Sequence, residues 1–292
     1  MKTNLKLSLV FLLSFLIWSC NSSTKTEEVT EVEIEETTEP SLTKVWETSE
    51  DLPTNESVLF DEATGDIYVS NIDGNPTEKD GKGSIAMINK EGEILHKEWV
   101  SGIDAPKGMG ISNGKLYVTN IDELVEIDIE TAQISKRYAI EGAEFLNDID
   151  TDGDKVYFSD MKTGRIHLFE NGDFSIFAEG QDNINGLRVG KNGVLYGLDG
   201  SGLKKYNSDG SFETLNRVVT GGDGLIVIDE HTFIASRWQG EIYLIQDGKE
   251  TKILDTKDEE SNTADIGFIP SDNLVLVPTF FKNKVVAYKL NY

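Results

Sequence analysis

The chain has 292 residues, of which 38% are hydrophobic, a share that fills a core of normal size and excludes global disorder. Its 52 acidic and 27 basic residues give a net charge of −25 at pH 7, so nucleic acid would be repelled over the whole surface. A single Cys and three His exclude a disulfide framework, a multi-Cys zinc site and an iron–sulfur cluster, and leave oxygen ligands and a hard cation for any metal site.

Residues 1–19 are predicted to be a secretory signal peptide. Lys2 and Lys6 form its positive start, and the apolar run from Leu9 to Trp18 is too short for a comfortable membrane span. The run ends in the sequence IWSC, which resembles a bacterial lipobox, so we expect Cys20 to be lipidated as the mature N-terminus. An ordinary signal followed by a chance cysteine is the alternative.

Residues 20–40 are predicted to be a flexible tether between the lipid and a folded domain. After Cys20 they carry seven Glu, one Lys and no apolar period, which is the composition of a solvated, self-repelling segment. We therefore expect the chain in the cell envelope, lipid-anchored to the outer membrane on its periplasmic or surface-exposed face. The lipid would be its only contact with a membrane.

Residues 41–292 repeat one pattern of short strands. Each copy has an apolar strand, a turn with Asp or Gly, an aromatic or β-branched strand, a second turn and a third strand. The second strands are expected at Asp66–Ser70, Lys115–Thr119, Lys155–Ser159, Val194–Gly197, Thr232–Ala235 and Asn273–Val277. The third strands are expected at Ser84–Ile88, Glu123–Ile127, Gly164–Phe169, Leu203–Tyr206, Glu241–Ile245 and Lys284–Tyr288.

These six units predict an all-β fold, a six-bladed β-propeller over residues 41–292. Their spacing of about 42 residues is that of propeller blades, and the helices that a TIM barrel needs are absent from the pattern. The last unit lacks an outer strand. Residues 42–48 are expected to supply it and so to close the ring without an open sheet edge.

The innermost strand of each blade is expected to begin with a polar residue near the axis. Counting back from the second strands gives Glu56, Lys107, Asn147, Asn185, Asp223 and Asp265. Taken singly, such residues are explained by the turn preferences of Asn-Gly and Asp-Gly pairs. As a set at one structural position they favour a site, because a position that faced a packed core would be Val, Ile or Ala.

The chemistry of this set suits a hard divalent cation. Glu56 and Asp223 supply two negative charges, and Asn147 and Asn185 supply amide oxygens, with water completing the coordination that Ca²⁺ prefers. We therefore expect Ca²⁺ or another divalent cation. The sequence from Asp148 to Gly153 copies the start of an EF-hand loop, but Ser159 stands at its twelfth position and the segment should form a strand, so we reject that motif.

Four segments in order resemble the senescence marker protein/gluconolactonase-like propellers, which include regucalcin, the diisopropylfluorophosphatases and bacterial lactonases. They are NESVLF with Glu56, FLNDID with Asn147, NINGLRV with Asn185 and GGDGLIV with Asp223. The resemblance implies one divalent ion in the central channel and makes Asp223 both a metal ligand and the catalytic carboxylate. Sugar-lactone hydrolysing members carry an Arg two residues before the blade-three Asn, where this chain has Phe145.

Further residues are expected to surround this site. Asp265 could act as a second catalytic base, and Lys107 could hold an anionic substrate or offset the acidic channel. The turns between second and third strands should wall the site with residues that bind the substrate: Asp160, Met161, Arg237, Trp238 and Phe280. The loop from Gly74 to Gly83 could act as a lid. The three histidines, on third strands or in a turn, are expected at the surface.

Two functions remain open. The first is a Ca²⁺-dependent hydrolase of lactones or related esters, with a small-molecule substrate that is partly apolar and less hydroxylated than an aldonolactone. The second is a non-catalytic propeller whose metal is structural and whose face binds a ligand or a protein partner. In either case we expect a monomer.

Overall fold

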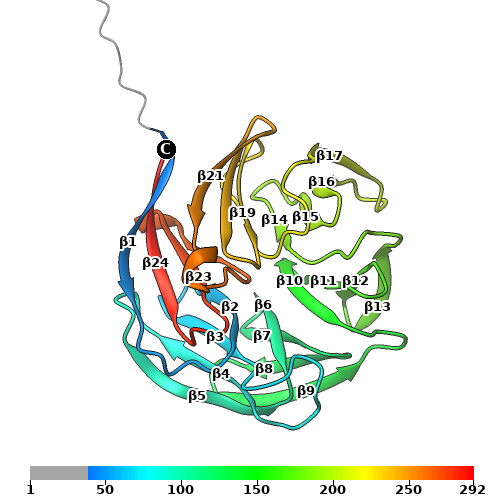
Figure 1. Ribbon diagram of the computed structural model, residues 1–292. Helices are drawn as coiled ribbons and strands as arrows, with labels where there is room; N and C mark the ends of the chain where they lie inside the picture. Colours follow the sequence, from blue (N-terminus) through cyan, green and yellow to red (C-terminus); the bar gives the residue numbers. More distant parts are fainter. Residues whose placement is uncertain (1–38) are drawn as a thin grey trace, which may run out of the picture. The chain divides into compact units, whose positions relative to one another are not determined.

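The computed structural model describes residues 39–292, which form six four-stranded antiparallel sheets arranged around a central axis (Figure 1). The predicted all-β, six-bladed propeller is confirmed. The signal peptide, Cys20 and nearly all of the tether lie outside the described residues. Within residues 39–292, no helix has both the length and the apolar character to cross a membrane.

Five blades are continuous in sequence. The first contains β2 (Asn55–Phe60), β3 (Ile67–Asn71), β4 (Gly83–Ile88) and β5 (Ile94–Ile103). The second contains β6 (Pro106–Ser112), β7 (Lys115–Asn120), β8 (Glu123–Asp128) and β9 (Gln133–Ala139). The third contains β10 (Leu146–Asp152), β11 (Lys155–Asp160), β12 (Arg165–Glu170) and β13 (Asp173–Ala178). The fourth contains β14 (Leu187–Val189), β15 (Leu195–Asp199), β16 (Gly202–Tyr206) and β17 (Phe212–Asn216). The fifth contains β18 (Leu225–Val227), β19 (Thr232–Arg237), β20 (Glu241–Gln246) and β21 (Lys249–Asp255).

The sixth blade joins the two ends of the domain. It contains β22 (Gly267–Ile269), β23 (Leu274–Pro278), β24 (Val285–Asn291) and, as its outer strand, β1 (Ser41–Glu47). β1 pairs with β24 from Ser41 opposite Asn291 to Glu47 opposite Val286, which confirms the predicted closure. Trp46 of β1 lies over Gly92, where a Cβ would come within 2.6 Å of the indole ring. The closing strand is therefore held by side-chain packing as well as by backbone hydrogen bonds.

The hydrophobic core lies between the blades rather than in one central mass. Each neighbouring pair of blades encloses one cluster of buried side chains, such as Tyr68 of β3 with Met109 of β6, and Ile166 of β12 with Leu187 of β14. Successive side chains along a strand point to opposite faces of the sheet, so each blade turns alternate side chains toward the two neighbouring blades. Because apolar burial is distributed around the ring, the axis itself is free to carry polar residues.

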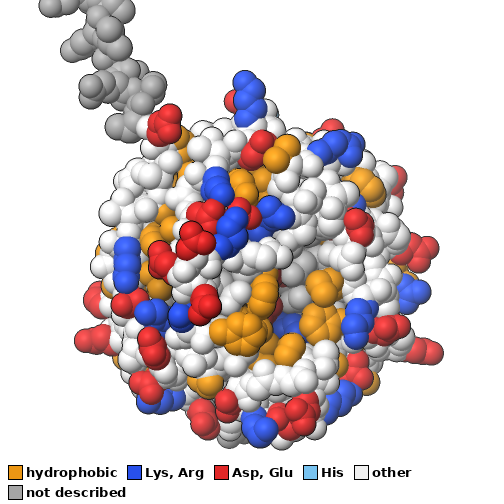
Figure 2. Space-filling model, in the orientation of Figure 1, with side chains coloured by type: hydrophobic (Ala, Val, Ile, Leu, Met, Phe, Trp, Pro, Cys, Tyr) orange, Lys and Arg blue, Asp and Glu red, His pale blue; other side chains and the backbone are white. Residues whose placement is uncertain are grey.

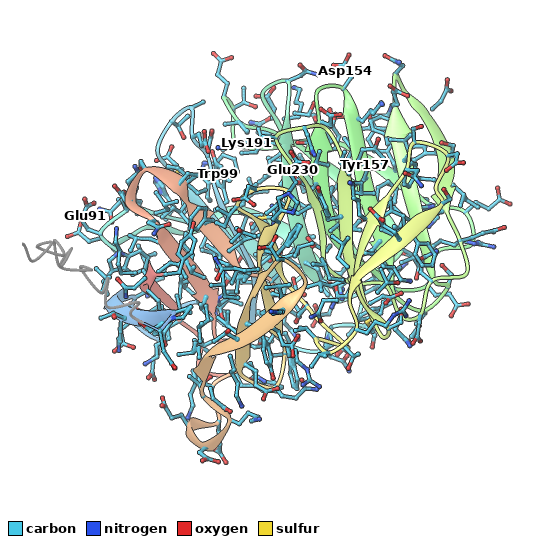
Figure 3. The ribbon with its side chains drawn as sticks, turned by 90° about the horizontal axis from the view of Figure 1, so that it is seen from above. Glu91, Trp99, Asp154, Tyr157, Lys191 and Glu230 are labelled. Carbon is cyan, nitrogen blue, oxygen red and sulfur yellow. The ribbon has the colours of Figure 1, made fainter. Side chains whose placement is uncertain are left out.

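The two faces of the ring differ in their loops. The turns between first and second strands, with Asp154, Lys191 and Glu230, lie along one side of the molecule (Figure 3). The other face carries the longer connections, including the 3-10 turn η1 (Lys257–Glu259); a second 3-10 turn, η2 (Pro270–Asp272), precedes β23.

The expectation that all three histidines lie at the surface is wrong for His167. It is 4% exposed and stacks on Phe158, with ring centroids 5.1 Å apart. Its side chain points from the third strand toward the neighbouring blade. Burial there lowers the pKa of its imidazole. His96 and His231 are exposed, as expected.

Candidate active site

Five of the six residues predicted at the inner-strand starts line one cavity. These are Glu56 on β2, Lys107 on β6, Asn147 on β10, Asn185 just before β14 and Asp223 just before β18. The cavity has a volume of about 520 Å³. Figure 2 shows this face, with hydrophobic side chains gathered around a hollow near the axis. The sequence pattern thus located residues from five different blades that share one site.

Glycine explains how two of these residues, Asn185 and Asp223, reach the axis. A Cβ on Gly186 would overlap the carbonyl oxygen of Asp223, and a Cβ on Gly224 would overlap the backbone nitrogen of Ile266. Neither glycine has a positive φ, so the Asn-Gly and Asp-Gly pairs do not serve a turn conformation here. They allow adjacent inner strands to approach closely, which brings the preceding polar residue to the axis. The turn-preference explanation does not hold at these two positions.

The floor of the cavity contains polar atoms that the fold leaves without partners. Asn185 Nδ2 donates a hydrogen bond to Asp223 Oδ1 over 2.8 Å. Among the described residues, the buried atoms Glu56 Oε2 and Asn185 Oδ1 make no hydrogen bond. Unpaired buried oxygens are costly, and two of them on residues that line one cavity indicate a site for a ligand.

Burial and mutual repulsion perturb the pKa values of these acids. Burial, reinforced by the charges of Asp223 and Asp265, raises the pKa of Glu56 well above its usual range. Burial, together with the charge of Asp265, raises the pKa of Asp223 to about 8, against the opposing hydrogen bond from Asn185. Without a bound cation, the site therefore favours protons on its carboxylates.

Lys107 is the only basic side chain that lines the cavity among residues 39–292. It is 1% exposed, donates a hydrogen bond to the carbonyl oxygen of Ala105 over 3.1 Å, and lies 4.7 Å from the ring centroid of Phe145. Burial lowers its pKa to about 8, although the nearby Glu56 carboxylate opposes that shift. Among the ion pairs of the described residues, none involves Lys107. Its ammonium group is thus available to an anion in the cavity.

Asp265 does not line the cavity but belongs to a second polar layer of the channel. Its Oδ2 accepts a hydrogen bond from Ser57 Oγ over 2.5 Å, and its Oδ1 lies 3.9 Å from Arg188. Asp148, which accepts hydrogen bonds from two backbone amides, and Asp150 face the same guanidinium group. This layer was not predicted as a unit, although the charged residues in the inner-strand segments NDID and NGLRV were its signal.

The residues on the floor fit a hard divalent cation. Two carboxylates and two amides offer only oxygen ligands, and the orphaned Glu56 Oε2 and Asn185 Oδ1 are among them. Within the described part of the chain, no three His, Cys, Asp or Glu side chains group as metal ligands, so a cation site here depends on the two amides. A cation would also offset the charge that raises the pKa values of Glu56 and Asp223.

The wall of the cavity is mostly apolar. Met161, Trp238 and Phe280 line it as predicted, and so does Phe281 from the same turn as Phe280. Ile72, Pro76 and Phe145, which the sequence did not single out as ligand-binding, line it as well. Gly74 and Pro76 place the loop predicted as a lid beside the cavity. The EF-hand-like segment lies in β10 from Asp148 to Asp152, so it forms a strand, as expected.

Two residues predicted to bind substrate have other partners. Asp160 is fully buried, and its carboxylate accepts hydrogen bonds from the backbone amides of Glu144 and Phe145. Arg237 forms an ion pair with Glu241 over 3.1 Å. Neither residue lines the cavity.

Asp160 has equivalents at the end of the second strand in neighbouring blades. Asn120 accepts from the amide of Ala105, and Asp199 accepts from the amide of Asp182. These side chains hold the loop that leads into their own inner strand. The recurring Asn or Asp after the aromatic strand was the sequence signal for this structural role.

No protein-family model matches the chain, and no curated protein matches it. Solved structures share its fold. A gluconolactonase from Xanthomonas campestris has a TM-score of 0.63 at 14% identity, with 86% of this chain and 95% of that chain covered. A virginiamycin B lyase from Staphylococcus aureus, crystallised as an inactive variant with quinupristin, has a TM-score of 0.60 at 14% identity, with 87% and 100% covered. A nidogen/laminin complex has a TM-score of 0.58 at 15% identity, with 69% and 80% covered.

At these identities the likeness shows the fold alone. The expected resemblance to gluconolactonase-like propellers is confirmed at that level. The neighbours include a lactonase, a lyase and a complex between two proteins, so the shared fold does not assign an activity to this chain.

Proposed function

We propose that this chain is a divalent-cation-dependent hydrolase of lactones or related esters. The observation that carries the proposal is the convergence of two buried carboxylates and two amides, with unpartnered oxygens on Glu56 and Asn185, at the floor of an open cavity. Glu56, Asn147, Asn185 and Asp223 would hold the cation, with Ca²⁺ as the expected ion. Bound there, it would supply Lewis-acid polarisation of the substrate's carbonyl oxygen.

Asp223 is the proposed catalytic base. Asn185 fixes its Oδ1, and among the described residues no hydrogen bond engages its Oδ2, so that oxygen is free to act on a water molecule. Asp223 takes a proton as the water oxygen bonds to the carbonyl carbon. The bond from that carbon to the ring or ester oxygen then breaks, and the proton passes to the departing oxygen. The products are a hydroxyl group and a carboxylic acid, which releases its proton to solvent and leaves as a carboxylate.

Lys107 and Asp265 are proposed to support this chemistry from different positions. The Lys107 ammonium reaches the cavity and can bind the negative charge of the product carboxylate. Asp265 lies in the second layer, so it acts on Asp223 through its charge and not by touching the substrate. It is therefore a positioning residue rather than the second catalytic base.

A hydrolysis screen of the full chain tests the proposal. Lactones and aryl esters are assayed after chelation and again after addition of Ca²⁺, in wild type and in the variants Asp223→Asn and Asp173→Asn. Asp173 is exposed on β13, away from the cavity, and is the matched control. We expect turnover that the chelator abolishes, that Ca²⁺ restores, and that only Asp223→Asn loses. Absence of turnover on every lactone and ester would refute the hydrolase.

The same variants distinguish the hydrolase from a second candidate function, a non-catalytic propeller whose metal is structural. The apolar wall favours it as well, because it offers a ligand-binding surface that needs no chemistry. Melting that shifts with chelator, without turnover, would select this function.

The cellular setting stays a proposal. Lipidation of Cys20 would anchor the chain in the cell envelope, with its substrate reaching the cavity by diffusion. The net charge of −25 disfavours nucleic acid and anionic lipid as partners. We expect a monomer.

A further inference from the structure

The wall of the cavity is more apolar than a hydrolytic site needs. Its polar side chains lie mainly at the inner-strand starts on the floor, whereas the loops contribute Ile72, Pro76, Met161 and a group of aromatic rings. A polyhydroxylated ligand above the floor would leave most of its hydroxyl groups without partners. A pocket of this kind discriminates against such a ligand.

Three aromatic side chains, Trp238, Phe280 and Phe281, form a continuous apolar surface, here called the aromatic triad. The ring centroids of Trp238 and Phe280 are 5.5 Å apart, those of Trp238 and Phe281 are 5.9 Å apart, and those of Phe280 and Phe281 are 4.8 Å apart. All three pairs meet edge to face, a favourable geometry for aromatic rings. The triad spans the loops of the fifth and sixth blades.

The exposed members of the triad do not serve the core. Phe280 is 7% exposed and packs on Ile72 and Ala264, so it anchors the group. Phe281 is 63% exposed and Trp238 is 37% exposed, although both line the cavity. Large apolar side chains that stay open to water at the mouth of a site indicate a binding surface.

The opposite wall is apolar as well. Phe145 and Met161 belong to the third blade, which lies across the axis from the sixth, and both line the same cavity. The cavity therefore has a charged floor between two apolar walls. Its volume of about 520 Å³ lies within the range of sites that enclose a substituted small molecule.

We infer that the substrate is amphipathic: a lactone or ester that carries an aliphatic or aromatic substituent bound against the aromatic triad. The inference rests on the proposed function for the reacting end, which lies at the floor near Lys107 and Asp223. The substituent lies against Trp238 and Phe281, across from Phe145 and Met161. The aromatic triad thus selects the substrate through its substituent, and the residues of the floor act on the lactone or ester group.

A homologous series of lactones tests this inference. The full chain with Ca²⁺ is assayed on γ-butyrolactone, γ-hexalactone, γ-octalactone and γ-decalactone, with gluconolactone as the hydroxylated comparison. A fully buried methylene group contributes roughly fourfold to kcat/KM. Because Trp238 and Phe281 stay partly exposed to water, we expect kcat/KM to rise only about twofold per methylene. Gluconolactone should be the poorest substrate.

Two variants identify the surface responsible. Phe281→Ala should lose about tenfold more on γ-decalactone than on γ-butyrolactone, because only the longer substrate reaches the ring. Phe212→Ala is the matched control, since Phe212 is 44% exposed on β17 and does not line the cavity. It should keep the wild-type dependence on chain length.

The outcomes distinguish this inference from the proposed function. Hydrolysis with no dependence on chain length, or with gluconolactone preferred, overturns the amphipathic substrate and leaves the hydrolase standing. If no lactone is hydrolysed, the proposed hydrolase function is refuted. A binding experiment then tests whether the aromatic triad binds an apolar group. Octanoate and acetate are then titrated against tryptophan fluorescence, for which Trp238 is the reporter. Octanoate binding that Phe281→Ala weakens and Phe212→Ala keeps supports the aromatic triad, and equal binding of the two anions overturns it.

Discussion

Replacing Asp160 should destabilise the fold, and the expected loss of unfolding free energy follows from the contacts of its carboxylate. It is fully buried, and its carboxylate accepts hydrogen bonds from four backbone amides, over 2.9 Å and 3.1 Å in one loop and 3.2 Å twice in the next. The first loop leads into β10 and carries Phe145 to the cavity. Asp160→Ala removes every one of these acceptors at once.

The expected loss is about 3 kcal/mol of unfolding free energy. A hydrogen bond to a charged group contributes roughly 1.5–3 kcal/mol, but water can reach the amides of the exposed loop residues and replaces part of each bond. Asp160→Asn keeps one acceptor oxygen and places a donor against backbone donors, so we expect about half that loss. Asp173→Ala, at an exposed position of the same blade, should change the free energy by less than about 0.5 kcal/mol.

Equilibrium urea unfolding measures these differences. With a slope of about 3 kcal/mol per molar urea, Asp160→Ala should lower the midpoint by roughly 1 M. A midpoint within error of the wild type would refute the structural role of Asp160. If the variant also lost hydrolysis at unchanged stability, Asp160 would bind substrate, as its turn position first predicted.

Three further predictions concern the cavity and the anchor. In metal-free protein the pKa values of Glu56 and Asp223 are raised, the latter to about 8, so these two carboxyl groups hold more protons in the folded than in the unfolded state above pH 5. Their contribution should make the stability seen in thermal melts fall from pH 5 to pH 8, and a flat profile contradicts the charge crowding. Added Ca²⁺ should restore stability most at pH 8. Lys107→Met should raise KM for anionic or ester substrates about tenfold with a smaller change in kcat, and an unchanged KM argues against its contact with the substrate. Cys20→Ala should release protein from the membrane fraction, whereas a soluble wild type would contradict lipidation.

Much of the fold was readable because each blade repeats a short pattern of alternating residues. Period-two alternation predicted strands at Lys115–Thr119 and Lys155–Ser159, and both observed strands end one residue later. Closure by residues 42–48 was predicted from the missing strand of the last blade, and the observed strand is Ser41–Glu47. The polar inner-strand starts were found because a polar residue recurred where a packed strand would be apolar. That argument needs no knowledge of three-dimensional distances.

The depth of each residue along the axis could not be predicted in the same way. Asp265 occupies the same position in its blade as Asp223, yet it lies in the second layer, paired with Ser57 and near Arg188. Its inner strand has an isoleucine between the acid and Gly267, whereas Asp223 directly precedes Gly224. Similarly, whether Asp160 faces the cavity or its own loop depends on loop geometry that strand periodicity does not encode.

The central claim is that Glu56, Asn147, Asn185 and Asp223 hold one divalent cation. Calorimetric titration of Ca²⁺ into the chelator-treated full chain, at salt high enough to screen the acidic surface, tests it most directly. We predict one site, with affinity reduced at least about tenfold in Asp223→Asn and in Glu56→Gln and unchanged in Asp173→Asn. Absence of Ca²⁺ binding, or equal affinity in all four proteins, would contradict the account.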